Sequence, residues 1–182
     1  MTSSFRHPFS LLAIALAAIA LALCAAGAAM AESGGIDADP PGSDKDGGAY
    51  RDARLKDGKA IAPDSAPARV KRAIRYANSI RKTKYVWGGG HGSFEDRGYD
   101  CSGAVSYMLH GARMLKAPSD SGGLMGWGSK RKGKWITVYA NSGHTYAVVA
   151  GLRWDTSGGP GPRWHRDGRS SAGFAVRHYK GF

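Results

Sequence analysis

Residues 99–109 read Tyr99-Asp100-Cys101-Ser102-Gly103-Ala104-Val105-Ser106-Tyr107-Met108-Leu109. Apolar residues at helical spacing predict a helix that begins at or just after Cys101 and ends at Ala117-Pro118, with a buried face of Val105, Met108, Leu109, Ala112 and Leu115. The cysteine therefore lies at a helix N-terminus, where unpaired backbone N–H groups and the helix dipole favour a thiolate and lower the pKa of the thiol. The same N–H groups are placed to receive an oxyanion.

A second segment supplies a base for this thiol. Asn141-Ser142-Gly143 predicts a tight turn, and His144 follows it at the start of an apolar strand. A Gly-Gly-Gly turn at Gly88 to Gly90 lies just upstream of the cysteine. A thiol and an imidazole brought together by the fold form the pair that nucleophilic hydrolases use, so the two segments predict a Cys/His hydrolase.

The first 31 residues have the order of a secretory signal peptide. Arg6 and His7 precede an apolar stretch from Leu11 to about Cys24, and Ala29-Met30-Ala31 follows as a small-residue cleavage motif. We expect cleavage after Ala31 and a location outside the cytoplasm, either secreted or in the cell envelope. An uncleaved membrane anchor is the alternative, because the apolar stretch approaches the about 20 residues that span a bilayer. Its Ala-rich, Leu-poor composition favours cleavage.

Cleavage would leave Cys101 as the only cysteine, because Cys24 lies in the signal segment. An odd cysteine in an exported chain is either a partner in an intermolecular disulfide or a free reactive thiol. A small buried hydrophobe is the third interpretation, but the polar neighbours Asp100 and Ser102 disfavour an apolar pocket. The sequence thus favours a free, reactive Cys101.

Composition divides the remaining chain near residue 65. Residues 32–65 are rich in Gly, Asp and Pro and hold almost no large apolar side chains, so we expect a disordered spacer that cannot repay the entropy of ordering. Residues 66–182 are expected to form one small catalytic domain. The spacer carries 8 acidic and 5 basic residues, whereas the domain carries 20 basic and 6 acidic residues, a net charge of +14.

The positive charge of the domain predicts attraction to polyanions, namely anionic cell-wall polymers, a membrane surface or nucleic acid. Export disfavours nucleic acid. The densest basic run, Lys130-Arg131-Lys132-Gly133-Lys134, lacks the interleaved aromatic residues of single-strand-binding proteins. A solvated loop is an equally good explanation of this run.

The other segments of the domain predict an α+β fold. Ser65 is expected to cap a first helix that has Pro67 in its first turn and a buried face of Val70, Ala73, Ile74, Ala77 and Ile80. A long loop is expected over 117–134, and strands over 135–140, 145–152 and 173–179. Two helices followed by an antiparallel meander predict N-terminal helices packed on a small antiparallel sheet. The Gly-rich loops at 88–92 and 119–128 are candidates for shaping a cleft.

Three motifs in this order resemble the NlpC/P60 family of cysteine peptidases. They are Tyr85-Val86-Trp87-Gly88-Gly89, then Asp100-Cys101-Ser102-Gly103 opening a helix, then Gly143-His144 opening an apolar strand. The resemblance covers about residues 66–182. It implies a papain-like fold with rearranged connectivity, and an enzyme that cuts peptide bonds in the stem peptides of bacterial peptidoglycan, commonly between D-glutamate and a diamino acid.

The resemblance also implies roles for particular residues. Cys101 would be the nucleophile and His144 the general base that later protonates the leaving amine. The family's third residue, usually His, Asn or Gln, orients the imidazole from the next strand, and Asp155 occupies that region here, with His165 in reserve. Asp departs from the usual residue type, although a carboxylate holds an imidazole equally well. Tyr85 is either a phenol that contacts substrate or oxyanion, or a core aromatic residue.

Other chemistries lack their motifs in this chain. No His-x-x-x-His or His-x-x-x-Asp pattern joins His91, His110 or His144, and no Gly-x-Ser-x-Gly motif is present, so we expect neither a metal nor a serine nucleophile, and no cofactor. His91 either lines the cleft or, as the favoured interpretation, is a solvated loop residue, and His110 is interpreted as a surface residue. The tryptophans are interpreted as core or cleft wall: Trp127, Trp135, Trp154 and Trp164.

Alternatives to a peptidoglycan endopeptidase stay open at this point. One is a non-catalytic wall-binding module on the same fold, and another is a thiol amidase or acyltransferase. The intact pair of Cys101 and His144 favours an enzyme, because a binding module has no need of a free thiol in an oxidising compartment. We expect a monomer whose partners are stem peptides.

Overall fold

The computed structural model describes residues 52–166 and 168–182. The predicted signal segment, residues 1–31, and the spacer up to residue 51 lie outside the described residues. Within the described part of the chain, no helix has both the length and the hydropathy needed to cross a bilayer.

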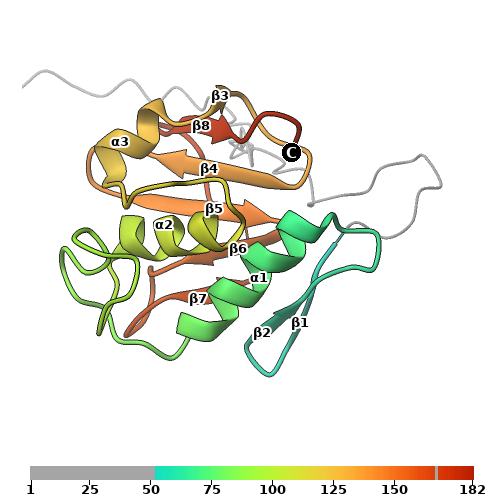
Figure 1. The fold of residues 1–182 in the computed structure, drawn as a ribbon, viewed down its shortest axis with the longest axis horizontal. Coiled ribbons are helices and arrows are strands. Elements are labelled where there is room, and N and C mark those ends of the chain that lie inside the picture. The colour runs from blue at the N-terminus through green and yellow to red at the C-terminus, as the bar shows by residue number, and fades with distance from the viewer. Residues whose placement is uncertain (1–51, 167) are drawn as a thin grey trace, which may run out of the picture. The chain divides into compact units, whose positions relative to one another are not determined.

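Three helices and a six-stranded antiparallel sheet make up most of this domain (Figure 1). The helices are α1 (Ala68–Ile80), α2 (Cys101–Gly111) and α3 (Ser121–Gly126). The sheet has the order β3-β8-β4-β5-β6-β7, with strands β3 (Ser129–Lys130), β4 (Ile136–Ala140), β5 (Thr145–Val149), β6 (Leu152–Asp155), β7 (Arg163–His165) and β8 (Ala175–His178). The expected α+β class, with N-terminal helices packed on an antiparallel sheet, is confirmed.

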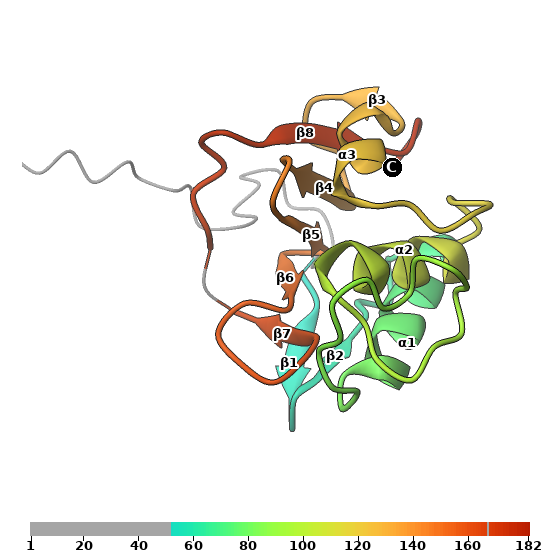
Figure 2. The ribbon, with the colours of Figure 1, turned by 90° about the vertical axis from the view of Figure 1, so that its left-hand side faces the viewer.

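Helix α2 packs beside α1 on one face of the sheet (Figure 2) and contacts β5 and β6. Ten of its eleven residues are buried, including Ser102 and Ser106, so it has no exposed face of the usual amphipathic kind. The indole N–H of Trp154, on β6, donates to the carbonyl of Ala104 at 3.1 Å and ties the helix to the sheet. The start of α2 at Cys101 is confirmed, but its end is at Gly111 rather than near Pro118, because Arg113 takes a positive φ of 59° that a helix cannot continue through.

The stripe predicted for the first helix is the buried face of α1. The predicted cap at Ser65 is wrong, because Ala66 donates its N–H to the carbonyl of Pro63 in a turn and the helix begins only after Pro67. Pro67 is extended, with ψ of 152°, and its carbonyl accepts the N–H of Lys71.

The predicted disordered spacer is wrong over residues 52–65. Strands β1 (Arg54–Lys56) and β2 (Lys59–Ile61) form an antiparallel hairpin. Its turn residues Asp57 and Gly58 both have positive φ, 49° and 71°, and Asp-Gly is a preferred sequence for such a two-residue turn. Composition misled the prediction because the hairpin has few large apolar residues of its own and buries small ones, Ala53 and Ala60, against the domain.

The predicted loop over 117–134 and the last strands also need correction. That loop contains α3 and the short edge strand β3. The predicted strand 145–152 is two strands, because Ala150 and Gly151 form a turn with φ of 45° and 80° that reverses the chain between β5 and β6. Strand β7 pairs with β6 and was not predicted.

Asn78, on α1, joins the hairpin and the sheet to the helix. Its amide oxygen accepts from the Ala60 N–H at 3.0 Å and from the Trp164 indole at 2.9 Å, and its amide nitrogen donates to the Ala60 carbonyl at 2.8 Å. We predict that Asn78→Ala lowers the free energy of unfolding by about 2 kcal/mol, since it strands buried polar groups. Urea denaturation measures this, and Arg75→Ala on the exposed face of α1 is the control. Equal stability of both variants would contradict the prediction.

Candidate active site

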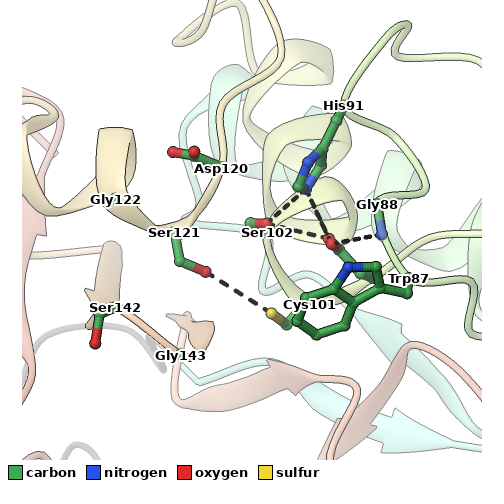
Figure 3. A pocket seen from close by; sticks show the side chains of 11 residues that line it. Trp87, Gly88, His91, Cys101, Ser102, Asp120, Ser121, Gly122, Ser142 and Gly143 are labelled. Atoms are coloured by element: carbon green, nitrogen blue, oxygen red, sulfur yellow. Dashed lines mark hydrogen bonds and ion pairs between the residues drawn. The ribbon is translucent and has the colours of Figure 1, made fainter.

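A pocket with a volume of about 260 Å³ opens at the N-terminus of α2 (Figure 3). Both Gly-rich loops that were candidates for shaping a cleft contribute to it. The described residues that line it are Trp87, Gly88, His91, Asp100, Cys101, Ser102, Asp120, Ser121, Gly122, Ser142 and Gly143. None of these is Lys or Arg, although the domain is strongly cationic.

The Asp100 side chain fixes the start of α2. It caps the helix by accepting the Gly103 N–H at 2.8 Å, and it also accepts the Gly88 N–H at 3.1 Å. Gly103 lies so close to the upstream glycine turn that a Cβ there would come within 2.0 Å of the Gly89 carbonyl oxygen. The Asp-Cys-Ser-Gly segment thus clamps the helix N-terminus against the Gly-rich loop and leaves Cys101 at the pocket.

The His144 imidazole lies at the start of β5, between two partners. Asn141 accepts the backbone N–H of His144 through its Oδ1 at 2.8 Å and holds the turn that aims the side chain. The ring Nε2 lies 2.9 Å from Asp155 Oδ1. The imidazole also lies close enough to the Cys101 thiol for each group to shift the pKa of the other. The structure therefore brings together Cys101, His144 and Asp155.

Asp155 is buried, and four groups hold its carboxylate. One oxygen accepts from His144 and from the Ser157 backbone N–H at 3.0 Å. The other accepts from the guanidinium groups of Arg153 and Arg169, the latter at 3.1 Å. A buried carboxylate needs such partners to stay ionised. The reserve candidate, His165, lies on β7 opposite Arg153 in the strand register, and it is Asp155 that contacts His144.

Electrostatics favour a thiolate–imidazolium pair. Burial raises the pKa of the Cys101 thiol, but hydrogen bonds from the His144 side chain and the Thr145 backbone N–H outweigh burial and bring that pKa below its usual value. The hydrogen bond to Asp155, followed by the one to Cys101, raises the pKa of His144 to about 9. Burial raises the pKa of Asp155, but the bond to His144 and the Ser157 N–H hold it well below its usual value. The shifts of the Cys101 and His144 pKa values both act in the direction of a thiolate–imidazolium pair.

Two hydroxyl groups that the sequence analysis did not single out form a hydrogen-bonded chain that ends at the Cys101 sulfur. Ser121 Oγ, from the first residue of α3, is 3.8 Å from Cys101 Sγ, and Thr145 Oγ1 donates to Ser121 Oγ at 2.9 Å. Because Ser121 already accepts the Thr145 proton, its own proton is available to the thiolate. The sequence analysis missed Ser121 because it assigned this segment to a loop. The sequence did contain a helix N-cap signal, since Asp120 accepts the backbone N–H of Gly123 at 2.7 Å.

His91 lines the pocket, which was the less favoured of its two interpretations from the sequence. Its Nε2 lies 2.9 Å from Ser102 Oγ and 3.1 Å from Asp100 Oδ1. The three side chains do not form a catalytic relay, because Ser102 and Asp100 meet the same ring nitrogen and Ser102 itself donates to Asp100 at 3.1 Å. The cluster instead forms one wall of the pocket beside the thiol.

Aromatic residues of the Tyr-Val-Trp segment lie at the surface. Trp87 lines the pocket with 84% of its surface exposed, and Tyr85 is 38% exposed, so neither is a core residue. Partial burial raises the pKa of Tyr85, and the negative charges of Cys101 and Asp100 raise it further, which puts the phenol in the electrostatic field of the thiolate.

The remaining histidines and tryptophans lie away from the pocket lining. His110 is exposed and stacks on Phe94, as a surface residue should, and His178 contacts the Arg131 carbonyl at 3.0 Å. Trp135, Trp154 and Trp164 are buried in the core, as predicted, and Trp127 packs against it. Among the described residues, no group of three or more His, Cys, Asp or Glu side chains is arranged to hold a metal ion.

Comparisons with known proteins give likenesses of structure only. No protein-family model matches the chain, and no curated protein matches it. The hypothetical invasion protein Rv1477 of Mycobacterium tuberculosis is 23% identical, with a TM-score of 0.49 over 70% of each chain. A structure of the Resuscitation Promoting Factor Interacting protein RipA mutated at a histidine is 23% identical, with a TM-score of 0.49 over 70% of this chain and 71% of that one. RipA mutated at a cysteine is 22% identical, with a TM-score of 0.47 over 70% and 72%.

The role of Asp155 predicts a shift in the titration of His144. In Asp155→Asn the pKa of His144 should fall from about 9 toward the ordinary 6.5, because the hydrogen bond to the Asp155 carboxylate is the largest cause of its elevation. The imidazolium form is then lost at lower pH. NMR titration of the imidazole measures this, with Asp120→Asn as a matched control in the pocket wall. An unchanged titration in Asp155→Asn would refute the assignment.

The hydroxyl chain at the sulfur predicts a shift in the titration of the thiol. Ser121→Ala should raise the pKa of Cys101, because it removes a donor to the thiolate, and Thr145→Val should do the same to a smaller extent because it frees the Ser121 hydroxyl to rotate. The pH dependence of Cys101 alkylation by iodoacetamide measures both. Ser142→Ala, in the pocket wall, is the control that should leave the midpoint in place. Identical midpoints for all three variants would rule out the role of Ser121.

Proposed function

We propose that this protein is an exported cysteine peptidase of the NlpC/P60 type, which cleaves peptide bonds in the stem peptides of peptidoglycan. The observation that carries the proposal is the grouping of Cys101, His144 and Asp155 at a pocket, with His144 hydrogen-bonded to Asp155 and close enough to Cys101 to shift its pKa. The three motifs of the resemblance all meet at this pocket, which supports the family assignment. Export rests on the signal segment, residues 1–31, in the sequence.

The array supplies each proton transfer that peptide hydrolysis needs. The Cys101 thiolate attacks the scissile carbonyl carbon, and the carbonyl oxygen takes the negative charge of a tetrahedral intermediate. The His144 imidazolium then protonates the departing amine, which leaves a thioester on Cys101 and a neutral imidazole. A water molecule, deprotonated by His144, attacks the thioester, and expulsion of the thiolate gives a carboxylic acid. The acid leaves and loses its proton to the solvent, so that the thiolate and imidazolium are restored.

Two groups are placed to stabilise the oxyanion. The backbone N–H of Cys101, the first residue of α2, has no carbonyl partner four residues earlier within the helix, and the helix dipole adds to its positive potential. The Tyr85 hydroxyl is the second candidate, since the phenol lies in the field of the thiolate. Asp155 would keep His144 oriented throughout, and Arg153 and Arg169 would keep Asp155 ionised.

The pocket suits a peptide rather than a small apolar ligand. Its lining combines glycines, hydroxyl groups and two carboxylates, with Trp87 as its large apolar side chain. Glycine-lined walls give access to an extended backbone, and the Asp and Ser side chains offer partners to the polar groups along it. The full chain is expected to act as a monomer, because the array is complete within one chain.

The first experiment is digestion of purified sacculi by the native protein, with mass spectrometry of the released muropeptides. We expect cleavage within the stem peptide, in which each cut bond gives one new amine and one new carboxyl group. Cys101→Ala and His144→Ala should each lower the rate by about 10³-fold or more, because each removes a member of the acyl-transfer array. His178→Ala, a histidine outside the pocket, is the matched control and should retain full activity.

The product pattern separates the proposal from its alternatives. Release of whole stem peptides from the glycan would indicate an amidase, and products formed only when an amine acceptor is added would indicate an acyltransferase. A native protein that binds sacculi and releases nothing would refute the peptidase and leave a binding module. Products that persist in Cys101→Ala would refute the thiol mechanism.

A further inference from the structure

The β1–β2 hairpin lies beside α1 (Figure 1). Residues of the hairpin and of the segment just after α1 line a second hollow, here called the basic groove. Its volume is about 410 Å³. The described residues that line it are Lys56, Asp57, Lys59, Ile61, Arg81 and Lys82. Four of these six side chains are cations, whereas the catalytic pocket is lined by none.

Two of the cations face each other across the hairpin. Lys56 and Lys59 are direct partners in the antiparallel register, on either side of the Asp57-Gly58 turn. Partners in register project from the same face of a sheet, and like charges placed directly opposite destabilise the pair. Both lysines are exposed, so the domain maintains a local concentration of positive charge that an anion would relieve.

The other two cations follow the last residue of α1, and Arg81 is fixed to the helix end. Arg81 is the C-cap of α1, and its guanidinium donates to the Asn78 carbonyl at 3.0 Å. Asn78 also bonds both backbone groups of Ala60, on β2. The helix end and the hairpin therefore keep a fixed separation, which sets the backbone frame of the groove. Interaction with the helix dipole explains why a cation such as Arg81 lies at the C-terminus of α1. It does not explain why Lys56 and Lys59 lie opposite each other on the hairpin.

The lining narrows the chemistry of the ligand. An arginine fork and three ammonium groups match phosphate oxygens. Ile61 is the one apolar side chain in the groove, 38% exposed, and no aromatic ring is present among the lining residues. The groove thus lacks the stacking platforms that single-stranded nucleic acids require and the apolar surface that membrane insertion requires.

We propose that the basic groove binds a linear phosphodiester polymer of the cell wall and so holds the domain at its substrate. The choice of a wall polymer rests on the proposed function, because it assumes action outside the cytoplasm. The groove and the catalytic pocket have different linings and no shared residue. Binding of the polymer therefore does not require the thiol, and Cys101→Ala should bind as the native protein does.

Fluorescence anisotropy with labelled synthetic poly(glycerol phosphate), at about 0.1 M salt, tests the proposal on the full chain. Replacing Lys56, Lys59, Arg81 and Lys82 by Gln should weaken binding about tenfold or more, as the loss of several charge contacts predicts. The matched control replaces Lys130, Arg131, Lys132 and Lys134 by Gln, with the same change in net charge, and should change affinity by less than about threefold. Equal losses in the two variants would overturn the proposal, because they would show attraction to net charge alone.

Two further measurements keep the test decisive if the fourfold variant folds poorly. Lys56→Gln/Lys59→Gln should weaken binding while leaving the melting temperature unchanged or higher, because it removes a repulsive pair. Asp57→Asn should strengthen binding, since it removes the groove's one carboxylate. Loss of affinity in Asp57→Asn, or tighter binding of a single-stranded DNA oligonucleotide than of poly(glycerol phosphate), would overturn the proposal. Sacculus digestion by the native protein is a separate readout, so failure of the groove and failure of the peptidase are distinguishable.

Discussion

The burial of α2 against α1, α3 and the sheet is the constraint on which the site depends. A helix with ten of eleven residues buried cannot slide or rotate without opening the core, and the Trp154 indole bond to Ala104 ties it to β6. Its N-terminus is consequently fixed relative to β5 and β6, the two strands that carry His144 and Asp155. Cys101 needs no flexible loop to bring it to its base, because the packing of the core already does so.

Positive charge is distributed unevenly over this domain, and the arrangement suits the chemistry of the site. Arg153 and Arg169 contact the buried face of the site through Asp155, on the side of the carboxylate away from the imidazole. The pocket itself is lined by carboxylates, hydroxyl groups and glycines. Cations in the pocket would compete with His144 for the thiolate, whereas cations behind Asp155 keep that carboxylate ionised. Four of the other cations line the basic groove.

Local patterns predicted those parts of the fold and site that depend on local physics. The buried face of α1, the start of α2 and strands β4 and β5 follow from apolar spacing, and the structure bears them out. The choice of Asp155 to face His144 came from a resemblance and a spacing, and the structure places the two side chains 2.9 Å apart. The hairpin at 54–61 was missed although Asp57-Gly58 marks it, because its stability comes from Asn78 and from burial of small residues against distant segments.

The sequence by itself determined the helix start that carries Cys101, the histidine that opens a strand, and the strong positive charge of the domain, because each depends on neighbouring residues or on composition. Only the tertiary structure decided which hydroxyl meets the sulfur, that His91 belongs to the pocket wall, and where the cations gather. Ser121 and Thr145 are 24 residues apart, yet their hydroxyl groups hydrogen-bond beside Cys101. Lys56 and Arg81, which are also distant in the sequence, line the same groove. Contacts between residues so far apart in the sequence depend on how the core packs, and no local sequence pattern predicts them.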